Sequence, residues 1–122
     1  MSAREIFRKI ERCLPYIRAS NGGVTVSGGE PLLQAGFLLG LFKLCKKKNI
    51  HTIIDTSGFY NPKAHQQILT LLNVTDLFIV DIKAIDRNLH RKLTGREVDA
   101  PLSLINILEH NKRPYWIRNV LV

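Results

Sequence analysis

The chain has 122 residues, of which 45% are hydrophobic and 23% are charged, and its formal net charge is +8. These values are typical of one globular domain and exclude a disordered or repetitive chain. No run approaches the ~18 apolar residues of a membrane span, and the amino terminus lacks a secretory signal. We therefore expect a single domain over residues 1–122 that resides in the cytoplasm and has no membrane partner.

The hydrophobic pattern alternates between helix and strand along the chain. Apolar residues recur at helical spacing from Ala3 to Ile17, which predicts an amphipathic first helix. Strands are expected near residues 23–27, 51–55, 76–82 and 114–121, separated by helical patterns over 33–45, over 62–72 and up to residue 108.

This alternation predicts the α/β class. The continuous apolar run from Leu77 to Val80 favours a parallel sheet covered by helices. A complete eight-unit barrel needs about 200 residues or more. About four βα units can therefore form only part of a barrel or a small open sheet.

The basic residues include a cluster of four lysines, Lys43, Lys46, Lys47 and Lys48. Such a cluster could attract nucleic acid, but it lies at the end of an apolar-periodic segment, where cations favour a helix carboxyl terminus. We therefore expect a solvated helix end and no nucleic-acid partner.

The two cysteines, Cys13 and Cys45, are too far apart in sequence for a zinc knuckle or a disulfide framework. Both fall on apolar stripes, so buried thiols are expected.

Polar residues and glycines follow each of the first three predicted strands. They are Gly28, Gly29 and Glu30 after the first, Asp55, Thr56, Ser57 and Gly58 at the second, and Asp81 and Lys83 at the third. In parallel α/β folds, ligands bind beyond the carboxyl ends of the strands, because neighbouring strand ends converge there. We therefore expect Gly29, Glu30, Asp55, Asp81 and Lys83 to share one concave rim.

The first of these groups has two explanations. Gly28 and Gly29 allow a sharp turn and a close approach of a ligand to the backbone, and Glu30 supplies a charge for a cationic ligand group. A strand-to-helix turn without a ligand can use the same residues, so both interpretations stay open. A phosphate-binding loop is disfavoured, because neither phosphate-binding motif is present and the carboxylate would repel phosphate.

The charged residues at the other strand ends also have alternatives. Asp55 and Asp81 would repel each other unless a cation or a hydroxyl-bearing ligand lay between them, although each can also be a turn former. Lys83 points the same way as Asp81 if the strand persists. Arg118 lies within an apolar strand and needs either a pocket or a carboxylate partner.

Four stretches in this order resemble the glycyl-radical-enzyme activating proteins of the radical S-adenosylmethionine superfamily: GGVTVSGGEPLLQ, HTIIDTSG, DLFIVDIK and WIRNVLV. The resemblance covers nearly the whole chain and implies a partial (β/α) barrel, a [4Fe–4S] cluster and bound S-adenosylmethionine. It further implies a 5′-deoxyadenosyl radical that abstracts hydrogen from a glycine of a partner enzyme such as pyruvate formate-lyase. Reduced flavodoxin or ferredoxin is the implied electron donor.

The resemblance also implies roles for individual residues. Gly28, Gly29 and Glu30 match the Gly-Gly-Glu motif that receives the methionyl amino group. Asp55 matches the acid of a D-T-[NS]-G block, near that amino group or a monovalent cation, with Thr56 beside it.

The third and fourth stretches carry three more residues of the implied cofactor site. Asp81 and Lys83 match a D-x-K pattern, with Asp81 suited to ribose hydroxyls or the cation and Lys83 to the methionyl carboxylate. Arg118 matches the arginine of W-I-R. No residue of this chain is assigned to catalysis itself.

One element of the family pattern is missing. The three-cysteine loop C-x-x-x-C-x-x-C, whose thiolates hold the cluster, has no counterpart in the sequence. We therefore expect the chain to correspond to the central part of the barrel, without the first strand, its cluster loop and the last strands. Two hypotheses follow: a truncated or split activating enzyme, or a cluster-less module that binds S-adenosylmethionine or a partner without catalysis.

Overall fold

The computed structural model describes residues 2–28, 30–82 and 99–119. In chain order its elements are α1 (Ala3–Arg12), α2 (Leu14–Ser20), β1 (Gly23–Val26), the 3-10 helix η1 (Pro31–Gln34), α3 (Ala35–Lys47), β2 (His51–Thr56), the 3-10 helix η2 (Pro62–Ala64), α4 (His65–Leu72), β3 (Leu77–Ile82), α6 (Asp99–His110) and β4 (Tyr115–Asn119).

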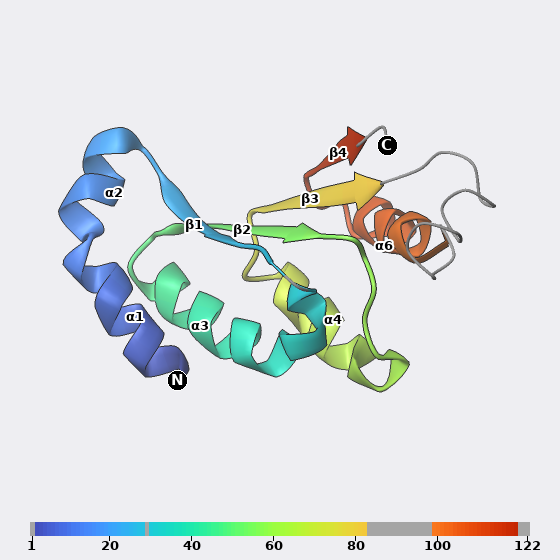
Figure 1. Ribbon diagram of the computed structural model, residues 1–122, viewed down its shortest axis with the longest axis horizontal. Coiled ribbons are helices and arrows are strands. Elements are labelled where there is room, and N and C mark those ends of the chain that lie inside the picture. Colours follow the sequence, from blue (N-terminus) through green and yellow to red (C-terminus); the bar gives the residue numbers. More distant parts are fainter. Residues whose placement is uncertain (1, 29, 83–98, 120–122) are drawn as a thin grey trace.

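The strands form one parallel sheet in the order β1-β2-β3-β4, which is also their order in the chain (Figure 1). Ile54 is aligned with Val26 on one side and with Phe78 on the other, and Asp81 is aligned with Arg118. The predicted α/β class with a parallel sheet is confirmed. The first three strands agree with their predicted bounds to within one residue.

The two faces of the sheet differ in burial because side chains alternate along each strand. Helices α3, α4 and α6 lie on the same side of the sheet (Figure 1). Phe78, Val80 and Ile54 point to this side and are at most 1% exposed, whereas Asp55 and Asp81 alternate with them and are partly exposed. The hydrophobic core is built mainly from these helices and this face, with Leu32, Leu38, Phe42, Ile68, Leu71, Leu104 and Leu108.

The amino-terminal helical pattern is divided into two helices, and the prediction of one continuous helix is therefore wrong. Pro15 occupies the first turn of α2, and Cys13 joins the two helices. A proline has no N–H and cannot continue the hydrogen-bond ladder of α1, so the chain changes direction there although the apolar spacing persists.

The two cysteines differ in burial. Cys45 is buried in α3 as predicted, but Cys13, at the junction of α1 and α2, is exposed. No helix among residues 2–28, 30–82 and 99–119 has the length and apolar character required to cross a membrane.

Candidate functional site

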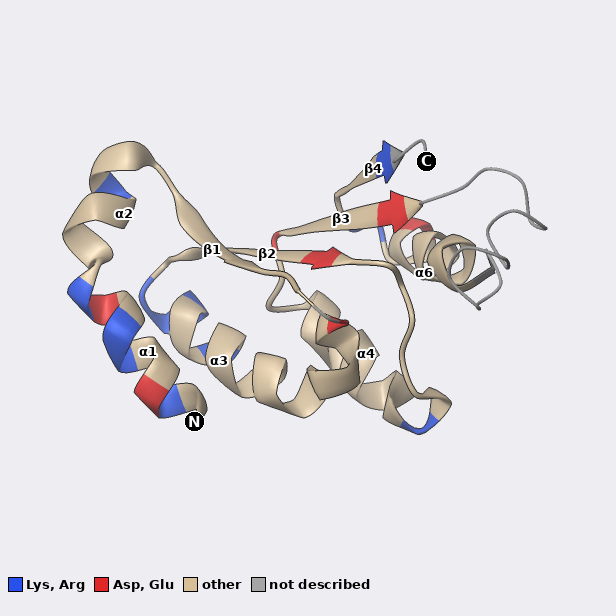
Figure 2. Ribbon diagram, viewed as in Figure 1, with Lys and Arg blue, Asp and Glu red and all other residues tan. Residues whose placement is uncertain are grey.

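Charged and hydroxyl side chains gather at the carboxyl ends of the strands. Figure 2 shows acidic residues near the ends of β2 and β3 and a basic residue on β4 beside them. We call this group the strand-end rim and define it as Gly28, Glu30, Asp55, Thr56, Ser57, Asp81 and Arg118.

The rim begins where β1 ends. Gly28 has a φ of 84°, a left-handed conformation that favours glycine, and an added Cβ there would meet no atom within 4 Å. The backbone conformation therefore favours glycine at this position although space is open beside it. Gly29, predicted to belong to the same loop, lies outside the described residues.

Glu30 joins this loop to the end of β2. Its side chain caps η1 by accepting a hydrogen bond from Leu32 N at 3.3 Å. The Thr56 hydroxyl donates to the same oxygen, Oε1. Ser57 donates to the other oxygen, Oε2, through its backbone N–H at 3.1 Å and through its hydroxyl. Two neighbouring strand ends are thus connected through one carboxylate.

The loop after β2 is constrained from two sides. The Thr56 Oγ1 atom accepts a hydrogen bond from Gly58 N at 2.9 Å. Gly58 has a φ of 87°, and a Cβ there would lie 2.8 Å from the carbonyl oxygen of Ala100 at the start of α6. Only glycine fits this approach, which fixes the chain path directly after Ser57.

Arg118 connects the acidic residues of β2 and β3. Its Nη2 atom donates to both carboxylate oxygens of Asp55, at 2.8 and 2.9 Å, and to Asp81 Oδ2 at 3.3 Å. The hydrogen bonds to Asp55, then the one to Asp81, and the charges of both carboxylates raise the pKa of Arg118 above its ordinary value. The predicted carboxylate partner of this arginine is therefore present, and its charge offsets the repulsion between the two acids.

One polar atom of the rim is left without a partner. Asp81 Oδ1 is buried and makes no hydrogen bond within the described part of the chain. Buried polar atoms in native structures nearly always have a partner, so an orphaned carboxylate oxygen at a strand end indicates a position for a ligand donor.

The structure brings most of the predicted rim together. Glu30 contacts the residues that follow Asp55, and Asp55 and Asp81 share Arg118. Lys83 lies outside the described residues. The cofactor-binding roles of all these residues stay predictions.

Thr56 differs in position from the two aspartates. It is 2% exposed and lies on the helix-covered face, where its hydroxyl serves Glu30 and Gly58. The monovalent-cation site predicted at Asp55, Thr56 and Asp81 stays a prediction.

Sequence reasoning did not assign a site role to Ser57, which supplies two donors to Glu30. A signal was available, because a serine directly after a strand-end Asp-Thr pair offers both a hydroxyl and a free backbone N–H. The distant partner, 27 residues earlier in the chain, was not readable from that pattern.

The cysteines do not form a cluster site. Cys13 is exposed and Cys45 is buried in α3, where burial raises the pKa of its thiol despite the opposing charge of Lys46. No group of three His, Cys, Asp or Glu residues in the described ranges has an arrangement suited to a metal ion.

Comparison with known proteins shows the family of this chain. The family model of the Radical SAM superfamily matches residues 1–122. The pyruvate formate-lyase-activating enzyme of Listeria monocytogenes is 40% identical over 99% of this chain and 50% of its own length. The enzyme of the same name from Staphylococcus epidermidis is 48% identical over 97% of this chain and 48% of its own length. The chain thus spans about half the length of these relatives.

A solved structure is also similar. A domain of pyruvate formate-lyase-activating enzyme from Bacteroides vulgatus superposes with a TM-score of 0.70 at 30% sequence identity, over 80% of this chain and 59% of that domain. Because the family model matches the entire sequence, the chain belongs to the radical SAM superfamily.

Proposed function

We propose that this chain forms the S-adenosylmethionine-binding part of an activating enzyme that generates a glycyl radical on a partner of the pyruvate formate-lyase type. The observation that carries the proposal is the strand-end rim, in which the buried Asp81 Oδ1 has no hydrogen-bond partner among the described residues and lies beside the Asp55–Arg118 pair. The similarity to activating enzymes of that name along nearly the whole chain supports the same conclusion.

The rim residues fit S-adenosylmethionine chemically. The molecule carries an ammonium group, a carboxylate and ribose hydroxyls, and, when bound, it supplies the sulfonium group whose reductive cleavage provides hydrogen-abstracting chemistry. Asp81 Oδ1 can accept a hydrogen bond from a hydroxyl or an ammonium group. The open space beside Gly28 admits a ligand against the backbone.

Arg118 holds the acidic part of the rim in position. Its side chain is 48% exposed, against 18% for Asp55 and 14% for Asp81. The guanidinium uses Nη2 for both aspartates. Because a guanidinium carries five N–H donors, it has further donors that could meet a carboxylate of the ligand. Arg118 can thus serve as a link between the acids and as a donor to the ligand.

The residues described do not fit a [4Fe–4S] cluster, which needs several converging thiolates. We therefore derive no step through the cluster and propose that its ligands come from a different segment. The alternative is a module that binds S-adenosylmethionine or a partner protein without catalysis.

The remaining assignments follow from the proposed activity. Reduced flavodoxin or ferredoxin would supply the electron, and the cytoplasm would be the location. A monovalent cation could join Asp55 and Asp81 only if it shared or replaced the contact with Arg118.

The test is anaerobic reconstitution with iron and sulfide, followed by dithionite and S-adenosylmethionine, with 5′-deoxyadenosine as the product measured. We expect product only when a polypeptide carrying the three-cysteine loop is added, and about tenfold less with Asp81→Ala. Product from the chain alone would overturn the argument about the cluster. Absence of product from the folded chain with the loop supplied would favour the module without catalysis.

A further inference from the structure

We propose that an open pocket at the amino ends of β1 and β2 binds a small organic anion that joins an apolar body to one phosphate or carboxylate group. The pocket has a volume of about 340 Å³, which lies within the range of about 300–1,000 Å³ for small-molecule sites. It lies at the opposite end of the strands from the strand-end rim, so the proposal does not depend on binding of S-adenosylmethionine.

Two turns form this pocket, one from α2 to β1 and the other from α3 to β2. Each helix ends in a Schellman motif with a left-handed asparagine, Asn21 with a φ of 54° and Asn49 with a φ of 55°. Gly22 N donates to Ile17 O at 2.9 Å, and the equivalent bond of α3 measures 3.0 Å. The register of β1 against β2 places the two turns side by side, so the backbone itself sets the shape of the pocket.

One part of the lining is apolar and consists of Leu14, Ile17 and Ile50. Ile50 is 2% exposed and belongs to the hydrophobic core, whereas Leu14 and Ile17 are partly exposed on α2. An apolar body in the pocket would remove this surface from water, which favours binding.

The other part of the lining is polar and contains no acid: Arg18, Asn21, Asn49 and His51. Arg18 Nη2 donates to Lys48 O at 3.0 Å and thereby links α2 to the end of α3. Because a guanidinium has five N–H donors, Arg18 has further donors for a ligand. The side-chain amides of Asn21 and Asn49 make no hydrogen bond within residues 2–28, 30–82 and 99–119. A phosphate or carboxylate group can accept from several of these donors at once.

The surroundings of the pocket are strongly basic, as Figure 2 shows for α1, α2 and the carboxyl end of α3. These helices, with the C-cap of α3, contain nine of the 18 basic residues of the chain and two of its 10 acids. The helix ends carry about half a negative charge each, which is less than the full charges of Arg18 and Lys48. Asp76 interacts with the lining residue His51 but is already paired with Lys46. The field at the pocket therefore favours an anion.

The first experiment tests whether both parts of the lining bind the ligand. Isothermal titration calorimetry compares phenyl phosphate with inorganic phosphate and with phenol, and phenyl phosphate should bind about tenfold more tightly than either. Benzoate, titrated in parallel, decides whether the anionic group is a phosphate or a carboxylate. Equal affinity for phosphate and phenyl phosphate, equal affinity for phenol, or no binding by phenyl phosphate and benzoate would overturn the proposal.

The second experiment assigns the binding to named side chains. Arg18→Gln should weaken the binding of phenyl phosphate about tenfold, and Arg18→Lys, which keeps the charge if Arg18→Gln does not fold, about threefold. Ile17→Ala should weaken phenyl phosphate about threefold and leave inorganic phosphate unchanged. The matched control is Arg4→Gln, which removes an equal charge from an exposed position on α1 and should change the affinity less than about twofold. Equal losses in Arg4→Gln and Arg18→Gln would mean general charge attraction and would overturn the site.

A third measurement locates the ligand directly. On titration with phenyl phosphate, the amide resonances of Gly22 and Asn49 should shift, and that of Gly58, in the loop after β2, should stay unchanged. A shift at Gly58 without one at Gly22 would place the anion at the carboxyl ends of the strands and contradict the proposal.

Discussion

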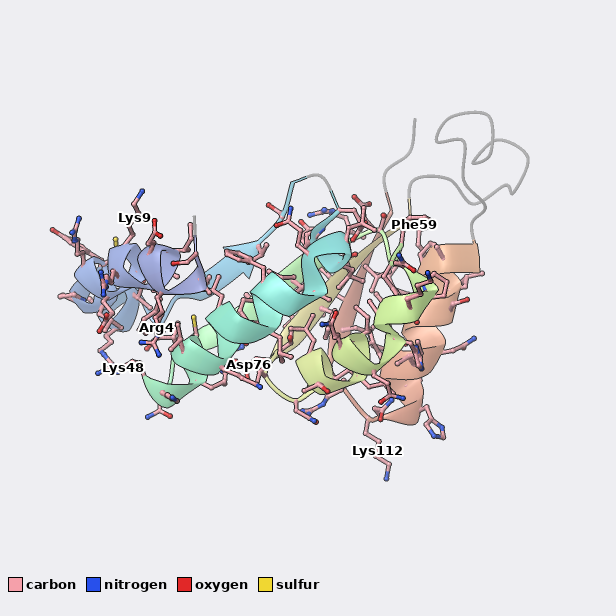
Figure 3. All side chains as sticks on the ribbon, turned by 90° about the horizontal axis from the view of Figure 1, so that it is seen from below. Arg4, Lys9, Lys48, Phe59, Asp76 and Lys112 are labelled. Carbon is pink, nitrogen blue, oxygen red and sulfur yellow. The ribbon has the colours of Figure 1, made fainter. Side chains whose placement is uncertain are left out.

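The two ends of the sheet use the same kinds of side chain for different purposes. At the amino ends of the strands, Asp76 accepts hydrogen bonds from Thr52 N at 2.8 Å and from Lys46 Nζ. At the carboxyl ends, Asp55 and Asp81 share Arg118, but Asp81 Oδ1 has no partner in the described residues. Figure 3 shows Asp76 close to the carboxyl-terminal half of α3, away from Phe59 in the loop after β2.

The two ends of the sheet differ in whether their polar side chains have all their hydrogen-bond partners within the described residues. The Asp76 group ties α3, β2 and the turn before β3 together: Thr52 Oγ1 donates to Val74 O at 2.7 Å and accepts from Asp76 N at 3.2 Å. At the carboxyl end, Asp81 Oδ1 has no partner within residues 2–28, 30–82 and 99–119, and the space beside Gly28 is open. A satisfied network stabilises the fold, and an incomplete one is suited to a ligand.

The largest loss of stability should come from a change at Gly23, the first residue of β1, and it contrasts with the same change at Gly28, two residues beyond the end of β1. A Cβ at Gly23 would lie 2.4 Å from the carbonyl oxygen of His51, whereas a Cβ at Gly28 would meet nothing. Gly23→Ala must move β1 away from β2 and should lower the free energy of unfolding by about 3 kcal/mol. Gly28→Ala should cost only about 1 kcal/mol, for its left-handed backbone.

Urea denaturation of both variants measures this contrast. Gly36→Ala is the control, because that glycine lies in α3 at ordinary contact distance from Gln67 and alanine favours a helix. Equal losses at Gly23 and Gly28 would mean that the amino end is no more tightly packed than the carboxyl end.

The second largest loss of stability should come from a change at Asp76. Asp76→Ala removes the acceptor of the buried Thr52 backbone N–H and the partner of Lys46. We expect a loss of about 2 kcal/mol in the free energy of unfolding, mostly from the unsatisfied N–H, because the ion pair itself is partly exposed and screened. The matched control is Glu11→Ala, an exposed acid of α1, which should change stability by less than about 0.5 kcal/mol. A loss as small as that of the control would show that the amino-end network contributes little.

The same residue should make stability depend on pH. Burial alone would raise the pKa of Asp76, but the hydrogen bond from Lys46, the hydrogen bond from Thr52 and the charges of Lys46 and His51 outweigh it and lower the pKa below its ordinary value. The folded state then binds the proton less readily than the unfolded state. This contribution is therefore present above the unfolded pKa of about 3.9 and is lost as the pH falls through the folded pKa.

Comparing the chain with Asp76→Asn isolates this contribution. Between about pH 6 and pH 3, the unaltered chain should lose up to about 1 kcal/mol more stability than the variant, a figure kept small by solvent screening. Parallel pH profiles would mean that the pKa of Asp76 is the same in the folded and unfolded states.

Both ends of the sheet also bear on what could be predicted from the sequence. Strand-end positions of Asp55 and Asp81 follow from the βα repeat and the alternation of side chains, so their common edge was predictable. The partner of Arg118 was predictable only as a carboxylate, because the register between β3 and β4 decides which one it meets.

Other features depend on tertiary contacts that leave no local pattern. The requirement for Gly58 comes from the approach of Ala100, which is distant in the chain. Ser57 can be recognised as a hydrogen-bond donor to Glu30 only when the register of β1 against β2 is known. Pro15 was visible in the sequence, but the regular apolar spacing around it concealed the break between α1 and α2.

The smallest loss of stability should come from a change at Arg118, which lies at the carboxyl ends of the strands. Arg118→Gln removes a half-exposed guanidinium, so stability should fall less than in Asp76→Ala even though Asp55 and Asp81 lose their shared cation. Raising NaCl to about 0.5 M should reduce the difference in stability between Arg118→Gln and the unaltered chain, because salt screens the remaining repulsion between the two carboxylates.

In the Arg118→Gln background, Asp81→Asn should increase Tm, since it removes one of two neighbouring charges, whereas in the unaltered chain the same change should leave Tm nearly constant. Thermal unfolding of the four proteins measures the coupling between the two positions. A large loss from Arg118→Gln that Asp81→Asn does not reverse would mean that Arg118 stabilises the fold as Lys46 and Asp76 do, and the carboxyl end would then be a second structural network.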